Sequence, residues 1–307
     1  MVRPMELRQL QYALQIAKSL NFSRAAENLH IAQPSLSQQI AKLEKELGVL
    51  LFQRNTNAVE LTYAGAVFVE KAQKIMDMIE QLIREMHDIS QIRKGRLIVG
   101  SLPITGSHIL PLVLPEFKRR YPDIEIVLVE ETTAVLESLT SSGQTDVCLL
   151  TLPIADPTLT WQELVEEEIW LAVPPAHPLI ERSGRREAVR IADLKGEPFI
   201  VLKRGQGFRK ITFDLCKNAG FEPKIVFEST NIETVQSLVA AGMGIALVPK
   251  MVARAREAEF SPAYVRLVER PTRTLVIAYR KGRYLSKAAE AFITVMSGVL
   301  GGKGANG

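Results

Sequence analysis

The sequence contains few of the residues that cross-link, anchor or export a chain. Its 307 residues include only two cysteines, Cys148 and Cys216, which excludes a disulfide scaffold and favours a reducing compartment. Neither cysteine lies at finger spacing from another metal ligand, so we expect no structural metal site. No apolar run reaches the length of a membrane span, and residues 1–5 lack the apolar core of a secretory signal. We therefore expect a soluble, cytoplasmic protein without a membrane partner.

The chain also lacks a strong charge of either sign. Lys and Arg number 38 and Asp and Glu 34, a net charge of +4 that permits an anionic partner without identifying one. A length of 307 residues exceeds what one hydrophobic core usually serves, so two or three domains are expected. Helical patterns dominate before Gly95. After it, short β-branched runs alternate with helical stretches, which predicts an α/β region.

The N-terminal residues predict three helices followed by a hairpin. Apolar residues recur every three or four positions in the first helix. Ser23 is expected to cap a short second helix, and Pro34 to open a third that ends at Gly48. We expect residues 49–61 to form two short strands around a polar turn at Asn55–Asn57.

The third helix has the composition of a DNA-recognition helix. Two short helices joined by a tight turn are typical of the helix-turn-helix motif. Polar side chains occupy the faces that the apolar residues leave free, at Ser35, Ser37, Gln38, Gln39 and Lys42. Such groups can reach base edges in the major groove. Arg54 stands where a wing would touch the DNA backbone or the minor groove. The alternative is a small helical domain with an exposed polar helix.

The helix expected after the capping residue Thr62 carries the most regular pattern of the chain. Its apolar residues are separated by alternating steps of four and three, which is the 3.5-residue period of a two-stranded coiled coil. We predict that this stripe dimerises the protein, the alternative being an amphipathic helix packed on its own domain. The stripe consists of Phe68, Ala72, Ile75, Ile79, Leu82, Met86 and Ile89.

The α/β region from Arg96 onward, of roughly 200 residues, has room for two lobes. We expect strands at 97–100, 124–129, 146–150, 169–173, 199–202, 224–227, 245–248 and 275–279, and helices at 109–120, 135–141, 208–218, 232–241 and 287–296.

Ligands of such folds bind beyond the carboxyl ends of the strands, between the lobes. The loops there contain our effector-binding candidates Ser101, Thr133, Thr151, Lys203 and Arg204. The cationic pair favours an anionic effector; the alternative is a solvated loop with helix-capping threonines.

No catalytic or cofactor pattern is visible in the sequence. The glycines around Met243 and Gln206 lack the G-x-G-x-x-G context of a nucleotide loop, so no cofactor is expected. Both cysteines lie in apolar stretches typical of a core. Glu166–Glu168 is typical of a solvated run rather than a catalytic carboxylate cluster. We expect no enzyme activity, although catalytic triads are assembled in space and spacing alone tests them weakly.

The ordered motifs of this chain resemble the LysR-type transcriptional regulators. They are Met5–Leu10, Ser23–Ala26, Gln33–Ser37, Ile40–Glu44, Leu47-Gly48, Leu51–Arg54, Leu61–Gly65, His177–Leu179 and Ala240–Pro249. The resemblance implies a winged helix-turn-helix DNA-binding domain over 1–62, a dimerising linker helix over 63–94 and an effector-binding domain over 95–307. That last domain would be two-lobed like the periplasmic binding proteins, with lobe I at about 95–166 and 270–307 and lobe II at about 167–269.

The resemblance also implies roles for single residues. Gln33, Pro34, Ser37 and Gln38 would meet bases or nearby backbone of double-stranded DNA, Ser35 and Lys42 would support them, and Arg54 matches the wing arginine. Many family members carry Arg where this chain has Gln38, which favours adenine contacts over guanine contacts. RNA polymerase, a small-molecule effector and further copies in a dimer or tetramer would be the other partners. The competing hypothesis is a solute-binding or enzymatic α/β protein whose N-terminal helices only dimerise.

Overall fold

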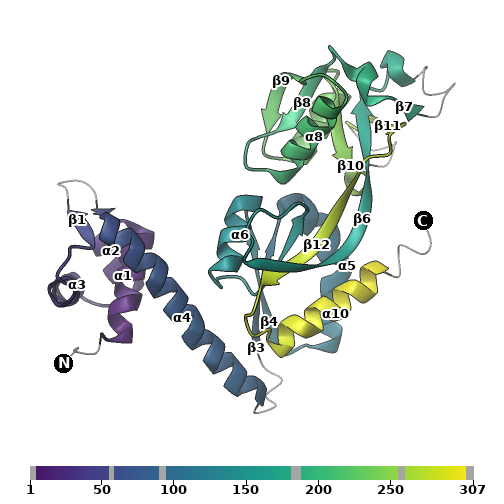
Figure 1. Ribbon diagram of the computed structural model, residues 1–307. Helices are drawn as coiled ribbons and strands as arrows, with labels where there is room; N and C mark the ends of the chain where they lie inside the picture. Colours follow the sequence, from purple (N-terminus) through teal and green to yellow (C-terminus); the bar gives the residue numbers. More distant parts are fainter. Residues whose placement is uncertain (1–4, 55–58, 90–94, 181–187, 255–259, 302–307) are drawn as a thin grey trace. The chain divides into compact units, whose positions relative to one another are not determined.

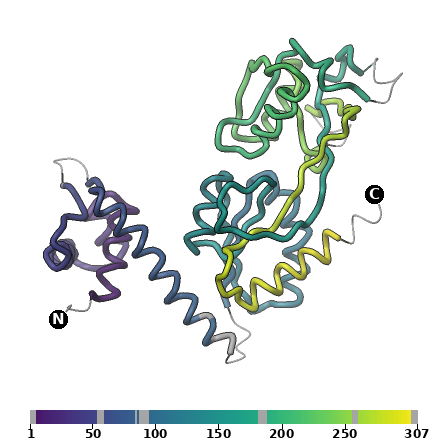
Figure 2. Tube along the Cα trace, in the orientation of Figure 1, coloured from purple at the N-terminus to yellow at the C-terminus, as the bar shows by residue number. Residues whose placement is uncertain are grey.

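The computed structural model describes residues 5–54, 59–89, 95–180, 188–254 and 260–301 (Figures 1 and 2). The chain divides into two compact units, residues 1–91 and residues 92–307. Each unit is described by itself. The predicted turn at Asn55–Asn57 lies outside the described residues.

The first unit is helical with one small hairpin. Its elements are α1 (Leu7–Ser19), α2 (Phe22–Asn28), α3 (Gln33–Leu47), β1 (Phe52–Arg54), β2 (Val59–Leu61) and α4 (Tyr63–Ile89). The three short helices enclose a core in which Ala13, Ile16, Leu36 and Leu43 are fully buried. This confirms the predicted order of elements in the first unit.

The start of α2 differs from the prediction. Asn21, not Ser23, is the N-cap: its backbone is extended and its side chain accepts a hydrogen bond from the Arg24 N–H at 3.0 Å. Ser23 as the cap is therefore wrong. Phe22 already belongs to the helix and buries its ring in the core, which starts the helix two residues earlier than we expected.

The junction between the hairpin and α4 is tight. Thr62 caps α4 as predicted, since its Oγ1 accepts from the Gly65 N–H at 2.9 Å and donates to the Leu50 carbonyl at 2.7 Å. A Cβ on Gly65 would lie 1.9 Å from the Leu51 carbonyl oxygen. Only glycine therefore allows the first turn of α4 to approach the backbone before β1 so closely.

The second unit consists of two α/β lobes that share strands. Its elements are β3 (Gly95–Ser101), α5 (Pro103–Arg120), β4 (Ile124–Glu130), α6 (Thr133–Ser141), β5 (Val147–Thr151), β6 (Leu159–Val173), β7 (Ala188–Val189), η1 (Ile191–Leu194), β8 (Pro198–Leu202), α8 (Gly207–Asn218), β9 (Lys224–Ser229), α9 (Ile232–Ala240), β10 (Ala246–Pro249), η2 (Lys250–Val252), β11 (Ala263–Leu267), β12 (Thr272–Arg280) and α10 (Lys287–Gly301).

One sheet runs through both lobes. Its strand order is β4-β3-β5-β12-β6-β11-β7, with β10 also paired to β6, and β8 and β9 form a separate parallel pair. β6 and β12 connect the lobes (Figure 1). In lobe I, α5 and α10 cover one face of the sheet and α6 covers the other. The core of lobe II forms around β8, β10, α8 and α9. Ile104 of α5 belongs to the lobe II core, and Met251 packs against both cores.

β6 is much longer than expected. The sequence predicts only residues 169–173, whereas β6 spans Leu159–Val173 and its first half pairs with β12. The sequence did not indicate this strand because the three consecutive carboxylates Glu166–Glu168 interrupt the alternation of apolar and polar residues that is typical of a half-buried strand. The run is not uniformly solvated either. Glu167 is 7% exposed and pairs with Arg273, so its interpretation as a solvated residue is wrong.

Candidate nucleic-acid interface and ligand cleft

α3 is amphipathic in the way a recognition helix requires. Leu36, Ile40 and Leu43 are fully buried against α1 and α2. The predicted DNA contacts lie on the remaining faces of α3 and differ in exposure. The exposed ones are Pro34, Ser35, Gln38 and Lys42, and the half-buried ones are Gln33, Ser37 and Gln39.

Two of the predicted DNA contacts are linked to each other. The Gln33 side-chain amide Nε2 donates a hydrogen bond to Ser37 Oγ at 2.8 Å, across one helical turn. Ser37 therefore keeps its own hydroxyl hydrogen for a further acceptor, and Gln33 keeps its carbonyl oxygen.

An open groove lies beside α3, toward β1. Its lining residues are Ser37, Gln38, Ala41, Glu44, Leu50, Phe52 and Gln53. The Glu44 carboxylate accepts hydrogen bonds from the N–H groups of Leu51 and Phe52, at 2.7 and 3.1 Å, and so fixes β1 against α3. Gln53 joins the exposed polar residues there and was missed, because a lone polar residue in a three-residue strand gives no sequence signal.

The structure gives less support to two other predicted DNA contacts, Lys42 and Arg54. Lys42 Nζ lies 3.6 Å from Glu6 Oε1 in an exposed ion pair, so it is directed toward the start of α1. Arg54 ends β1, paired with Val59, and its side chain lies outside the described residues.

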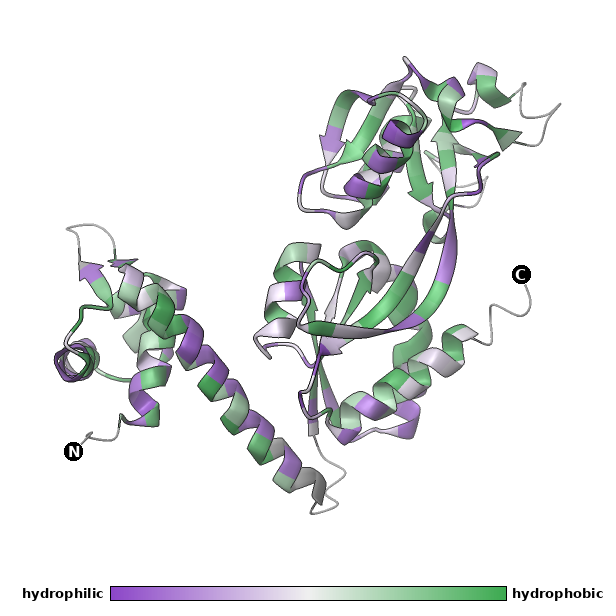
Figure 3. Cartoon of the chain, in the orientation of Figure 1, coloured by the Kyte–Doolittle hydropathy of each residue, from purple (hydrophilic) through white to green (hydrophobic). Residues whose placement is uncertain are grey.

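The apolar stripe of α4 is packed against its own domain at its start and is exposed further along the helix. Ala72 is buried and Phe68 packs against the core of the first unit, so both are used within their own domain. Further along, Ile75, Leu82 and Met86 are exposed and Ile79 is half-buried. Met78 and Ile83 widen this exposed apolar surface, and Ile89 ends the helix with its side chain outside the described residues. Apolar and polar residues alternate along this half of α4 (Figure 3).

In the second unit, buried hydroxyl groups gather at the carboxyl edge of the lobe I sheet. Ser101 ends β3 and Thr151 ends β5, and both are buried. Thr133 opens α6, after β4. Thr105, in the first turn of α5, is 1% exposed and adds a further hydroxyl to this edge.

These hydroxyls are not capping groups. Among the described residues, Oγ1 of Thr105, Thr133 and Thr151 has no hydrogen-bond partner, and α6 has no side-chain cap. The alternative that the threonines cap helices is therefore wrong. Ser101 Oγ donates to the Leu102 carbonyl at 3.1 Å. Buried hydroxyls without partners are costly, so this edge is suited to a ligand that supplies the missing partners.

Lobe II approaches the same edge through the first turn of α8. A Cβ on Gly207 would lie 2.9 Å from Thr133 Oγ1, so the absence of a side chain allows this close approach between the lobes. Lys203 and Arg204 follow β8, shortly before α8, and both are exposed.

A buried ion pair joins the two strands that connect the lobes. Arg273 on β12 and Glu167 on β6 are directly paired in the sheet, with 2.7 Å from Arg273 Nε to Glu167 Oε2. The guanidinium also lies over the Phe208 ring at 5.5 Å, and Glu167 accepts from the Met251 N–H. Burial lowers the pKa of Arg273, and the negative charge of Glu167 opposes that shift. The pair anchors the first turn of α8 to the strands that cross between lobes.

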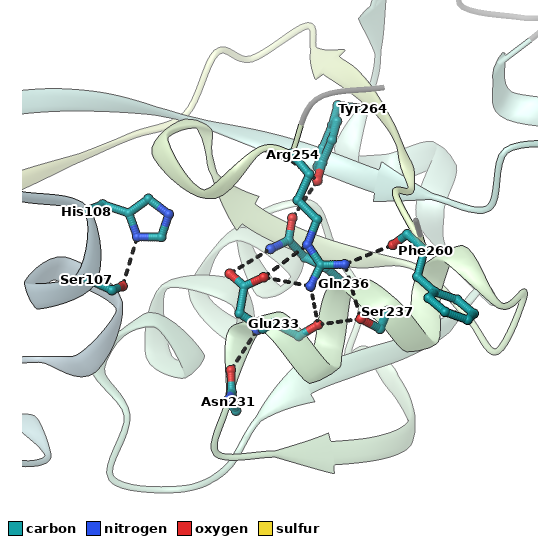
Figure 4. A network of polar contacts seen from close by, with 9 residues as sticks. All are labelled: Ser107, His108, Asn231, Glu233, Gln236, Ser237, Arg254, Phe260 and Tyr264. Atoms are coloured by element: carbon teal, nitrogen blue, oxygen red, sulfur yellow. Dashed lines mark hydrogen bonds and ion pairs between the residues drawn. The ribbon is translucent and has the colours of Figure 1, made fainter. Parts of the chain in front are cut away.

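A second polar network lies within lobe II (Figure 4). The Arg254 guanidinium binds the Glu233 carboxylate, the Ser237 hydroxyl and the Phe260 carbonyl. The Tyr264 hydroxyl donates to Gln236 and accepts from the Arg254 N–H. These hydrogen bonds join residues of α9 to Arg254, Phe260 and Tyr264, so the network ties α9 to the chain around β11.

Neither cysteine is placed for thiolate chemistry. Both are fully buried, Cys148 in lobe I and Cys216 in lobe II. Burial raises the pKa of the Cys148 thiol to about 12 and that of Cys216 to about 11. A thiol with a raised pKa is a poor nucleophile and a poor metal ligand at neutral pH.

Two family models match most of the chain. Residues 7–66 match the bacterial regulatory helix-turn-helix protein, lysR family, and residues 90–300 match the LysR substrate binding domain. None of the helices in the described ranges combines the length and apolarity that a membrane crossing needs.

Relatives and solved structures match over nearly the full length. The HTH-type transcriptional regulator YcgK of Bacillus subtilis is 41% identical, over 98% of this chain and 100% of its own. A hydrogen peroxide-inducible genes activator of Pectobacterium carotovorum is 34% identical, over 91% of each chain. Full-length OxyR of Pseudomonas aeruginosa superposes with a TM-score of 0.74 at 28% identity, over 97% of this chain and 95% of that one. Full-length CbnR in complex with its target DNA gives 0.67 at 26% identity, over 96% of this chain and 100% of that one.

Proposed function

Because this chain belongs to the LysR family of DNA-binding transcriptional regulators, we propose that it binds an interrupted inverted repeat as an oligomer and that a small molecule between the lobes controls this binding. The observation that carries the proposal is the polar surface of α3. The side chains of Gln33, Ser35, Ser37 and Gln38 stand on faces that the core of the first unit does not use.

The linked pair Gln33 and Ser37 is the centre of base recognition. A fixed Ser37 hydroxyl and the Gln33 carbonyl present a donor and an acceptor at the start of α3, where a recognition helix meets base edges. Gln38 and Gln53 extend this surface along the groove. Pro34, Ser35, Lys42 and Arg54 support it through backbone contacts.

The second half of α4 dimerises the protein. Ile75, Ile79, Leu82 and Met86 form its seam and Ile89 continues it, while Phe68 and Ala72 position the helix on its own domain. A dimer of this kind places two α3 helices at a fixed separation, which is why an inverted repeat is the expected site. A tetramer follows if the second units also associate.

The effector occupies the cleft between the lobes. Ser101, Thr133 and Thr151 line it from lobe I, with Lys203 and Arg204 from lobe II, and Thr105 adds a further hydroxyl. Its binding shifts the balance between two arrangements of lobes or subunits, and thereby DNA bending and contact with RNA polymerase. The protein acts without catalysis, in the cytoplasm.

The effector acts by binding rather than by oxidising a thiol of this chain. The Pectobacterium relative is named for hydrogen peroxide induction, but the two thiols here are buried in different cores and have raised pKa values. A disulfide between them requires the lobes to unfold, and a neutral buried thiol reacts slowly with peroxide.

A footprint on the DNA upstream of the protein's own gene, with random-sequence competitor present, tests the proposal. We expect protection over two half-sites separated by a multiple of the helical repeat. Protection that random DNA removes equally well would support the competing hypothesis, in which the first unit only dimerises the chain.

A further inference from the structure

We propose that Gln53 on β1 recognises an adenine of the half-site, in the groove between β1 and α3. This rests on the proposed function and deepens it, because it assigns a base and two contacting atoms to a residue outside the recognition helix. The groove has a volume of about 700 Å³; α3 contributes Ser37 and Gln38 to its lining, and β1 contributes Gln53. A base that meets the first turns of α3 is therefore adjacent to Gln53 as well.

The side chain of Gln53 points away from the core of the first unit. Phe52, the residue before it, is 4% exposed and packs in that core. Successive side chains of a strand point to opposite faces, and Gln53 is exposed. Within the described part of the chain, its amide has no hydrogen-bond partner. The Nε2 donor and the Oε1 acceptor are therefore both free to bind another molecule.

The backbone that carries Gln53 is held on both sides. Glu44 Oε1 accepts hydrogen bonds from the N–H groups of Leu51 and Phe52, which fixes the two preceding residues to α3. Gln53 itself is paired with Glu60 of β2 in the hairpin. A side chain on an ordered backbone loses less freedom when it binds, so Gln53 is well placed for a specific contact.

The charges around Gln53 favour a base over a phosphate. None of the described residues that line the groove is a lysine or an arginine. Glu44 lines it, and its second oxygen, Oε2, has no donor among the described residues. Glu60 is exposed and lies directly across from Gln53, on the same face of the hairpin. Two carboxylates repel a phosphate at this position, whereas the amino group of a base is attracted to them.

A glutamine amide matches adenine better than the other bases. In the major groove adenine presents the N7 acceptor and the N6 amino donor, which Nε2 and Oε1 of one glutamine contact together. Guanine presents only acceptors there and cytosine only a donor. Ala41 and Leu50 line the same groove and are exposed, so they offer apolar contact to the methyl group of a thymine. The lining therefore selects an A·T pair.

The test uses the full-length protein and the duplex that the footprint identifies. Each adenine of a half-site is replaced in turn by 7-deazaadenine, which lacks the N7 acceptor but still pairs with thymine. We expect at least one adenine at which this change weakens wild-type binding about 10-fold in a competition assay. This measurement needs no variant, so a folding defect does not affect it.

Three matched variants assign the contact to a residue. Gln53→Met removes the amide but keeps the side-chain length, and it should weaken binding to the unmodified duplex about 10-fold, with little effect on random DNA. At the adenine that Gln53 contacts, 7-deazaadenine should then cause no further loss, because the partner of N7 is already missing. Gln38→Met should leave that adenine sensitive. Gln11→Met, which changes an exposed glutamine of α1 outside the groove, should keep wild-type affinity and every sensitivity.

The inference is overturned by a wild type that 7-deazaadenine affects nowhere in the half-site, or by a Gln53→Met protein in which every sensitive adenine stays sensitive. Equal losses on cognate and random DNA also overturn it, since Gln53 would then contact a phosphate. All three results leave the proposed function standing, because they require a specific site. A footprint that random DNA removes refutes the proposed function itself, and this inference with it.

Discussion

The Gln33 side-chain amide is bonded to the Ser37 hydroxyl at 2.8 Å on the surface of α3. The two residues therefore form one hydrogen-bonded unit on α3. Ser37 accepts from Gln33 and can donate outward, and the orientation of each side chain depends on the other.

Replacing either partner of this unit should cost specific DNA binding by a similar amount. We expect Ser37→Ala and Gln33→Ala each to weaken binding to the cognate site about 10-fold, with little effect on random DNA. The double variant should be little worse than either single one, because the first change already releases the other side chain. Competition binding on cognate and random duplexes measures both quantities. Additive losses would mean that the residues contact DNA separately.

Removing a buried threonine hydroxyl should raise or lower the stability of the fold according to whether that hydroxyl has a hydrogen-bond partner. Thr105→Val removes a buried hydroxyl without a protein partner and should stabilise the ligand-free protein by about 1 kcal/mol. Thr140→Val is the matched control, since Thr140 Oγ1 donates to the Leu136 carbonyl at 2.7 Å, and it should destabilise by about 1–2 kcal/mol. Urea unfolding of the full chain measures both. A Thr105→Val protein as destabilised as Thr140→Val would mean that the Thr105 hydroxyl is satisfied.

A lysine within the exposed half of the α4 stripe should dissociate the dimer. Leu82→Lys places a charge on an apolar seam, which we expect to raise the dimer dissociation constant about 100-fold. Glu80→Lys, two residues away and also exposed, should leave association unchanged. Sedimentation velocity over a range of concentrations distinguishes the two. An unaffected Leu82→Lys dimer would place the interface on another face.

The buried thiol of Cys148 should make the fold sensitive to alkaline pH. Burial raises its pKa to about 12, whereas the unfolded thiol titrates near 9.0. Between these values the folded state binds more protons than the unfolded state, so stability falls as pH rises, by about 1.4 kcal/mol per pH unit from this group. Cys148→Ala should remove that part of the slope. Urea unfolding at pH 8 and pH 10 makes the comparison, and equal slopes in both proteins would contradict it.

The first unit was predictable because its signals are local. Pro34 and Gly48 define α3 from within a few residues, and the period of three to four separates its buried from its exposed faces. Even there, Asn21 replaced Ser23 as the cap, since two adjacent polar residues compete for one position and the burial of Phe22 decides between them.

The candidate ligand site was predictable only in outline. Strand ends placed Ser101 and Thr151 correctly at one sheet edge, because the carboxyl ends of parallel strands meet. The pair of Arg273 with Glu167 joins residues 106 positions apart, and no local pattern encodes it. Glu167 lies in an acidic run, from which we predicted a solvent-exposed residue. It is buried because the run belongs to the long strand β6, in which alternate residues face the interior.

Gly65 has a mechanical consequence. α4 is 27 residues long, hence a rod of about 40 Å, and its first turn touches the Leu51 backbone with no side chain between them. Glu44 ties the same Leu51 to α3. A tilt of the rod by about five degrees moves its far end by about 3.5 Å. Because the start of α4 is fixed to α3 in this way, we expect a small displacement of its far end to rotate the α3 side chains that we propose face the bases.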